Sequence, residues 1–284
     1  MSKQYHYLVA GLPDLFIDDS KLSISTVEYR DMLTESMSGK DMQLIRLFFY
    51  EYDNQNVLKN IKNADSAFDK RGNLSETELE TAFDMAKEGV TEGAGLIPTY
   101  IVQFISAYKS ETPIFEGKSW ELQLSELYYE FVTSASNDFV SDWFKFQRDM
   151  QNLITAVQCR KYNVPVENQL IGKSELTEKL SRSNARDFGI DSDFIMLEPI
   201  LKATEEEDLL EFEKKIDRIK WDYLDDRVFF HYFTVEKLFA FLIKLSIVER
   251  WLELDKETGR KLFNELLSNL EAGYEFPEEF KLKK

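Results

Sequence analysis

The chain has 284 residues, of which 43% are hydrophobic and 14% aromatic, so it can bury a sizeable core and is not a disordered chain. Its formal net charge of −17 disfavours general binding to nucleic-acid phosphates and direct adsorption to an anionic membrane leaflet, because both rely on clustered Lys and Arg. The single cysteine, Cys159, excludes a disulfide within the chain and a thiolate metal cluster.

Apolar residues recur at spacings of three and four along most of the chain, which is typical of amphipathic helices packed on one another. No stretch shows the sustained alternation of a strand, although residues 22–37 fit either a strand or a short helix. Capping boxes at Ser75–Glu78 and Thr204–Glu207 mark two helix starts. The pattern predicts an all-α fold with helices over residues 41–62, 76–87, 99–109, 120–135, 139–162, 205–220, 235–254 and 256–270, the one over 139–162 capped by Asp138, and one or two short ones within 166–190.

The apolar runs and the start of the chain predict a cytoplasmic protein. Met1–His6 lacks the apolar run of a signal peptide. The longest apolar stretch, 238–248, is interrupted by Lys244 and Ser246 and is too short to span a bilayer. The surrounding segment 235–254 is apolar around most of its circumference, so we expect this helix to pack against several neighbours.

A short phrase occurs twice in the helical pattern. Asp53-Asn54-Gln55-Asn56 is followed by apolar residues at helical spacing, and so is Asp149-Met150-Gln151-Asn152, which begins 96 residues later. The same register next reaches Leu245, inside the most apolar helix. Three periods of this length would fill about 288 positions, which is close to the length of the chain. The chain is therefore interpreted as one all-helical domain of three related units, which cover residues 1–284 as roughly 1–112, 113–198 and 199–284.

Each copy of the phrase places an aspartate and an asparagine three residues apart on one helix face, as Asp53 with Asn56 and Asp149 with Asn152. Polar side chains among apolar neighbours are usually hydrogen-bonded when buried. We expect these residues to be structural polar pairs that bond to the backbone of an adjoining helix. A direct role in binding a ligand is the less favoured alternative.

No combination of residues predicts catalysis, a metal site or a cofactor. Asp69–Glu80 has acidic or amide residues at the first, fifth and twelfth positions of a calcium loop. However, Arg71 and Leu74 occupy positions where such a loop needs an oxygen ligand and a glycine, so a turn into a capped helix is the better interpretation. His6 and His231 are the only histidines, which disfavours a histidine metal site or a catalytic triad.

The repeated phrase resembles the C-type subunit, called d-type in the eukaryotic enzyme, of the V/A-type rotary ATPases. Arg148–Tyr162 is similar to that family's stretch of Asp, Asn and two later basic residues, and Leu170–Gly172 is similar to the loop that follows it. Tyr52–Lys59 resembles the first unit of the family, and Tyr5–Ala10 resembles its aromatic start. The sequence departs from the family at Gly11, where the family usually has arginine, and in the third unit.

The resemblance implies a pseudo-threefold helical funnel that catalyses nothing and needs no cofactor. Such a protein is a socket between the central shaft and the membrane rotor ring of an ion-translocating ATPase. It implies partners among the other ATPase subunits, no nucleic acid, and attachment to the membrane only through those subunits.

The resemblance and the charge pattern together select candidate interface residues. Residues 142–187 carry eight basic and six acidic residues in a chain of net charge −17, an asymmetry that can orient docking. The candidates are Arg148, Arg160, Lys161, Glu249 and Arg250. Two other classes of function stay open, namely a helical-repeat scaffold of an unrelated cytoplasmic complex and an enzyme with an unrecognised acidic site.

Overall fold

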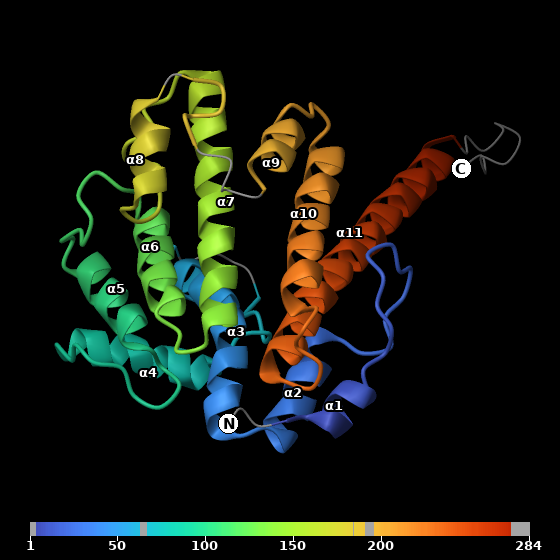
Figure 1. The fold of residues 1–284 in the computed structure, drawn as a ribbon, viewed down its shortest axis with the longest axis horizontal. Coiled ribbons are helices and arrows are strands. Elements are labelled where there is room, and N and C mark those ends of the chain that lie inside the picture. The colour runs from blue at the N-terminus through green and yellow to red at the C-terminus, as the bar shows by residue number, and fades with distance from the viewer. Residues whose placement is uncertain (1–3, 63–66, 184, 191–195, 274–284) are drawn as a thin grey trace, which may run out of the picture.

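The computed structural model describes residues 4–62, 67–183, 185–190 and 196–273. Over these residues the chain forms eleven α-helices and no strand, which confirms the all-α prediction (Figure 1). The helices are α1 (His6–Ala10), α2 (Thr26–Ser36), α3 (Gly39–Ile61), α4 (Glu76–Lys87), α5 (Thr99–Lys109), α6 (Trp120–Thr133), α7 (Asp138–Tyr162), α8 (Glu175–Arg182), α9 (Leu197–Thr204), α10 (Leu209–Val228) and α11 (Val235–Gly273).

Side-chain caps fix most of the helix starts. Ser75 accepts from the backbone N–H of Glu78, whose carboxylate accepts from Ser75 in return, so the predicted capping box is confirmed. A second capping box, from Ser25 to Glu28, begins α2 and decides that residues 22–37 contain a helix rather than a strand. At the end of α7, Asn163 adopts the left-handed conformation that commonly closes a helix.

Several helix boundaries differ from the sequence prediction: α7 is capped by Asn137 and not by Asp138, and α10 runs to Val228 where an end at residue 220 was predicted. The predicted capping box at Thr204 is wrong, because Thr204 is the last residue of α9 and its hydroxyl donates to the carbonyl of Leu201. Asp208 caps α10 instead, accepting from two backbone N–H groups at the start of the helix. The two helices expected on either side of residue 255 are one continuous helix, α11, since neither glycine nor proline lies at the expected junction, residues 251–258.

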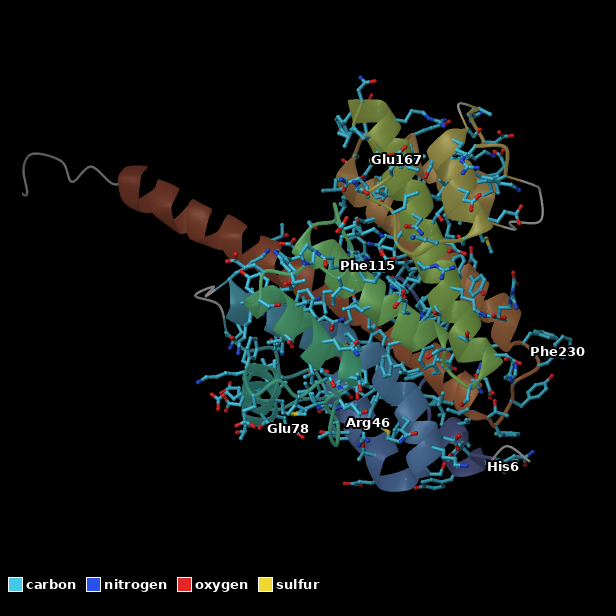
Figure 2. The ribbon with its side chains drawn as sticks, turned by 90° about the vertical axis from the view of Figure 1, so that its left-hand side faces the viewer. His6, Arg46, Glu78, Phe115, Glu167 and Phe230 are labelled. Atoms are coloured by element: carbon cyan, nitrogen blue, oxygen red, sulfur yellow. The ribbon has the colours of Figure 1, made fainter. Side chains whose placement is uncertain are left out.

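Helix α11 organises the packing of the described residues. It contacts α2, α3, α7 and α10, which confirms the prediction that this helix packs against several neighbours. Its buried side chains include Leu238, Leu242, Leu245 and Val248. The C-terminal part of the helix leaves the other helices and extends away from them, as Figures 1 and 2 show.

The remaining helices pack mostly in chain order. The chain runs along successive contacts from α4 to α5, α6, α7 and α8, while α9 packs on both α7 and α10. Buried side chains from Tyr5 to Val248 belong to one hydrophobic cluster, so the three sequence units share a core. The pseudo-threefold funnel itself stays a prediction. No helix within the described residues is both long and apolar enough to cross a membrane.

Candidate functional site

The first copy of the repeated phrase holds the loop between α3 and α4. Asn56 is buried on α3, and its Nδ2 donates to the carbonyl oxygen of Asp69 at 2.9 Å. Its Oδ1 accepts from the backbone N–H of the same residue, also at 2.9 Å. One side-chain amide therefore pairs with both backbone groups of one residue. We call this arrangement an asparagine clamp; its partner is loop backbone, whereas the sequence suggested helix backbone.

Asp53 fixes the same loop one helical turn earlier. Its carboxylate is almost fully buried and accepts from the backbone N–H groups of Asn73, at 2.9 Å, and Leu74, at 3.0 Å. The Asn73 side chain also donates to this carboxylate, at 3.2 Å, and to the carbonyl of Arg46, at 3.0 Å. Each buried polar group thus has a partner, which a low-dielectric site requires.

The close approach of this loop to α3 depends on Gly72. A Cβ atom at position 72 would lie 2.2 Å from Oδ1 of Asp53, well inside the contact distance of any two heavy atoms. From the other side, Arg30 of α2 donates through Nη1 to the carbonyl oxygens of Arg71, at 2.7 Å, and Gly72, at 2.6 Å. The loop is therefore held by side chains from two helices.

The second copy of the phrase repeats the asparagine clamp. Asn152 of α7 is buried, and its Nδ2 donates to the carbonyl oxygen of Ile171 at 2.8 Å. Its Oδ1 accepts from the backbone N–H of Ile171 at 2.7 Å. Two long helices thus hold the loop that follows them by the same device, 96 positions apart in the sequence.

The aspartates of the two copies differ. Asp149 pairs with its neighbour Arg148, whose Nη2 lies 2.8 Å from Oδ1, and about a fifth of its side chain is exposed. Its partner is thus a charged side chain, whereas Asp53 holds loop backbone. At the third register, Leu245 and Val248 are fully buried apolar residues. The asparagine of the phrase therefore holds a loop in both copies, whereas the aspartate holds a loop only in the first. The third register carries apolar residues in place of the phrase.

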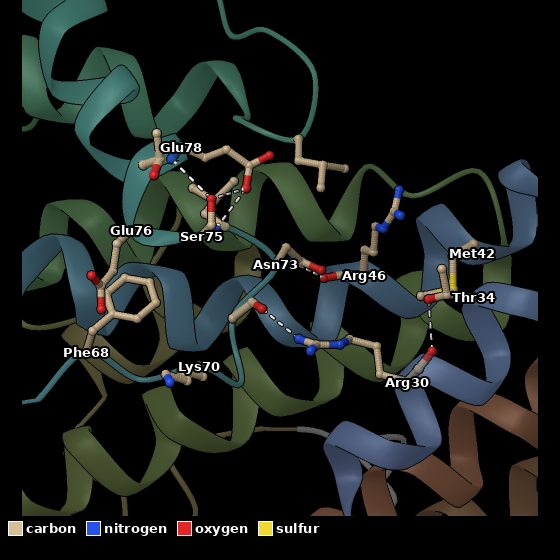
Figure 3. Close-up of a pocket in the computed structure, with 14 residues that line it drawn as sticks. Arg30, Thr34, Met42, Arg46, Phe68, Lys70, Asn73, Ser75, Glu76 and Glu78 are labelled. Carbon is tan, nitrogen blue, oxygen red and sulfur yellow. Dashed lines mark hydrogen bonds between the residues drawn. The ribbon is translucent and has the colours of Figure 1, made fainter.

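A cavity of about 600 Å³ adjoins the first clamp, between α2, α3 and the start of α4 (Figure 3). Arg30, Arg46 and Lys70 line it together with Glu76 and Glu78, so its charge is mixed. The other lining residues are Thr34, Met42, Phe68, Gly72, Asn73, Leu74, Ser75, Thr77 and Leu96. Among the described residues of the chain, no group of three or more His, Cys, Asp or Glu side chains is placed to hold a metal ion.

The buried carboxyl of Asp53 should make stability depend on pH. Burial raises its pKa from 3.8 to about 6, although the hydrogen bonds from Leu74 and Asn73 lower it. Between these two values the folded state holds a proton that the unfolded state has released, so the free energy of unfolding falls as pH rises through this window. We expect this group to contribute a loss of about 1 kcal/mol between about pH 5 and pH 6, measured by urea denaturation. Asp53→Asn should remove that part of the pH dependence; an equal dependence in both proteins would contradict the expectation.

Three of the candidate interface residues lie on α7. Arg160 donates to the carbonyl oxygens of Ser183, at 2.8 Å, and Ala185, at 2.7 Å, and its guanidinium lies 3.8 Å from the ring centroid of Phe188. It therefore ties the segment after α8 to α7. Arg148 is occupied by Asp149, as described above. Lys161 is exposed and makes no ion pair with any residue that the structure describes.

The other two candidates lie on α11 and make contacts within the chain. Glu249 accepts from the backbone N–H of Thr26 at 3.2 Å. Arg250 forms ion pairs with Glu213, at 3.2 Å, and with the buried carboxylate of Asp217. These residues join α11 to α2 and α10, and whether they also meet a partner stays a prediction.

The isolated nucleophilic and titratable residues lie in structural surroundings. Cys159 is buried, and burial raises the pKa of its thiol. His231 packs against the ring of Phe139 with centroids 5.4 Å apart, and its Nδ1 lies 3.6 Å from the carboxylate of Glu236. These surroundings are those of a packed thiol and a packed imidazole.

Sequence reasoning did not identify Arg30 or Gly72, which complete the first loop, and it considered Asn73 only as the fifth position of a possible calcium loop. The available signal was local: a glycine next to an asparagine, a few residues before a capping box, is typical of a loop that approaches other backbone closely. Arg30 gave no signal, because its partners are backbone carbonyls more than forty positions away.

The fold and these contacts define an all-helical protein in which two long helices each hold their following loop through a buried asparagine. The chain belongs to the DUF2764 family, described as "Protein of unknown function (DUF2764)", which matches residues 1–274. No curated protein and no solved structure matches the chain.

Proposed function

We propose that this protein is a non-catalytic central-stalk subunit of a V/A-type rotary ATPase, a socket that links the central shaft to the membrane rotor ring. The observation that carries the proposal is the Asn152 clamp. The two neighbouring stretches that resemble the C-type subunit, Arg148–Tyr162 and Leu170–Gly172, are joined by the two hydrogen bonds between Asn152 and Ile171. The two stretches that resemble the family in sequence are thus also bonded to each other in the structure.

The first clamp adds support, because a protein built from related helical units should repeat its internal contacts. Asn56 and Asp69 reproduce the paired hydrogen bonds of Asn152 and Ile171 in the first unit. The continuous core that joins the units suits a part that transmits torque, since a closely packed interior deforms little under load.

The proposal is tested by purifying the tagged full-length chain from detergent-solubilised membranes and identifying the co-purifying proteins by mass spectrometry. We expect the catalytic, shaft and ring subunits of a rotary ATPase to be recovered together, and not from an untagged strain. Recovery of unrelated proteins, or of none, would overturn the proposal, and a reproducible unrelated set would favour the scaffold alternative.

Lys161 offers a direct test of the proposed basic interface. Its side chain is exposed and forms no ion pair among the described residues, so Lys161→Glu should reduce recovery of ATPase subunits about tenfold without unfolding the protein. Lys87→Glu makes the same change of charge at an exposed position in the last turn of α4 and is the matched control. Equal recovery with both variants would remove this face of α7 from the interface. Arg160 is less suitable for this test, because its replacement would also release Ser183 and Ala185.

A further inference from the structure

The turn between α10 and α11 carries a run of aromatic side chains that the protein leaves exposed. Phe229, Phe230 and Tyr232 expose 65%, 80% and 63% of their surface, and Tyr7 of α1 exposes 91%. We call these four residues the aromatic tip. Scattered exposed apolar residues are ordinary, whereas several large ones at one end of a molecule mark an interaction site.

Several contacts bring the parts of the aromatic tip to one place. The rings of Phe229 and Phe230 lie perpendicular with centroids 4.9 Å apart. Helix α1 joins this turn because the backbone N–H of Tyr5 donates to the carbonyl of Phe233 at 2.7 Å, and the ring of His6 lies 4.3 Å from that of Phe233. Figure 2 shows Phe230 projecting beyond the ribbons at the end where His6 also lies.

The base of the aromatic tip is anchored in the body of the protein. His231 packs on Phe139 of α7, and its backbone N–H donates to the carbonyl of Val228 at 2.9 Å. The carboxylate of Glu236 accepts from Asn137 at 2.7 Å, which joins the start of α11 to the start of α7. An anchored apolar surface loses little conformational entropy on binding, so it is suited to form the centre of an interface.

The charges beside the aromatic tip are mainly acidic. Two aspartates, Asp222 and Asp226, precede Phe230 by eight and four residues. This spacing places them on the face of α10 that leads to Phe230. Asp138 precedes Phe139, against which the turn packs. These three carboxylates are exposed and form no ion pair with the residues that the structure describes. The opposing charges are Lys237, in the first turn of α11, and Arg227, in the last turn of α10, which is paired with Asp142 at 3.7 Å.

The three exposed carboxylates Asp138, Asp222 and Asp226, which we call the acidic rim, favour some binding partners of the aromatic tip over others. A second copy of the chain would bring two acidic rims together, and an anionic lipid surface would repel the same carboxylates. A protein with an apolar pocket flanked by lysine or arginine complements both the aromatic centre and the rim. We propose that the aromatic tip is a docking surface for such a basic-rimmed protein partner. This inference stands apart from the proposed function, since it specifies the chemistry of the partner and not the complex to which the partner belongs.

The test is site-specific photo-crosslinking of the full-length chain in cells of the source organism. Phe230→p-benzoylphenylalanine places the crosslinker at the tip, and Leu209→p-benzoylphenylalanine places it at the opposite end of α10, where 72% of the leucine is exposed. We expect position 230, and not position 209, to crosslink one protein through an apolar segment flanked by lysine or arginine. Adding Asp222→Asn and Asp226→Asn to the Phe230→p-benzoylphenylalanine protein should lower the yield about tenfold. Raised salt should also lower the yield when the protein without the two amide substitutions is crosslinked in a cell lysate.

The remaining outcomes would overturn the inference. These are crosslinks to lipid, crosslinks between two copies of the chain, the absence of any crosslink, a contacted segment without basic neighbours, or a yield that the two amide substitutions leave unchanged. Purification from solubilised membranes decides the proposed function independently. If it returns no ATPase subunits while position 230 captures a basic-rimmed partner, the stalk proposal fails and the docking surface stands.

Discussion

Asn152→Ala is expected to lower the free energy of unfolding by about 2–4 kcal/mol, because it leaves two buried backbone groups of Ile171 without a partner, each costing about 1–3 kcal/mol. Ile171 is 1% exposed, so bulk water does not reach its backbone groups in the folded protein. Urea denaturation followed by circular dichroism measures the change. Gln158→Ala, at an exposed position of α7, should change stability by less than about 0.5 kcal/mol.

The same substitution in the first clamp provides a graded comparison. Asp69 is partly exposed, so water can partly satisfy its backbone groups after Asn56→Ala, and we expect a loss of about 1–2 kcal/mol. Asn60→Ala, at an exposed position of α3, is the control. If both clamp variants unfolded like their controls, the paired amide hydrogen bonds would not stabilise either loop, and the structural basis of the proposed function would be lost.

The sequence identified the asparagines because two independent signals coincided at them. A polar residue on an apolar helix face requires a partner when buried, and the repeated phrase showed that the requirement recurs. The identity of the partner was not accessible, since Asp69 and Ile171 follow their asparagines by 13 and 19 residues, and loop geometry sets these separations. The two aspartates illustrate the same limit, because identical residues in one phrase acquire a buried backbone contact in one copy and a partly exposed ion pair in the other.

Local signals predicted helices better than the points at which helices begin. Both Thr204 and Asp208 precede acidic residues and a helical pattern, so sequence alone supports either as a cap. The decision depends on where α9 ends against α7 and α10, which is a tertiary contact. Exposure is equally non-local: Leu209 continues the apolar spacing of α10, yet it is 72% exposed.

Gly72→Ala is expected to destabilise the protein by about 2–4 kcal/mol, through overpacking and loss of a buried hydrogen-bond network. The new Cβ atom would lie 2.2 Å from Oδ1 of Asp53 and 3.4 Å from its backbone nitrogen. The carboxylate cannot retreat without losing the backbone N–H groups of Asn73 and Leu74. Gly39→Ala is the matched control, since a Cβ atom there meets nothing within 4 Å and alanine favours the helix.

A double-mutant cycle distinguishes this steric cause from a general intolerance of the loop. Asp53→Ala should itself be destabilising by about 1–3 kcal/mol, because it leaves the same two N–H groups unpaired. Once the carboxylate is gone, however, the Cβ atom at position 72 has room, and Gly72→Ala should cost less than about 1 kcal/mol in that background. The two changes are therefore expected to couple by about 1–3 kcal/mol when stabilities are measured by urea denaturation. Strictly additive losses would show that the close approach to Asp53 does not determine the residue at this position.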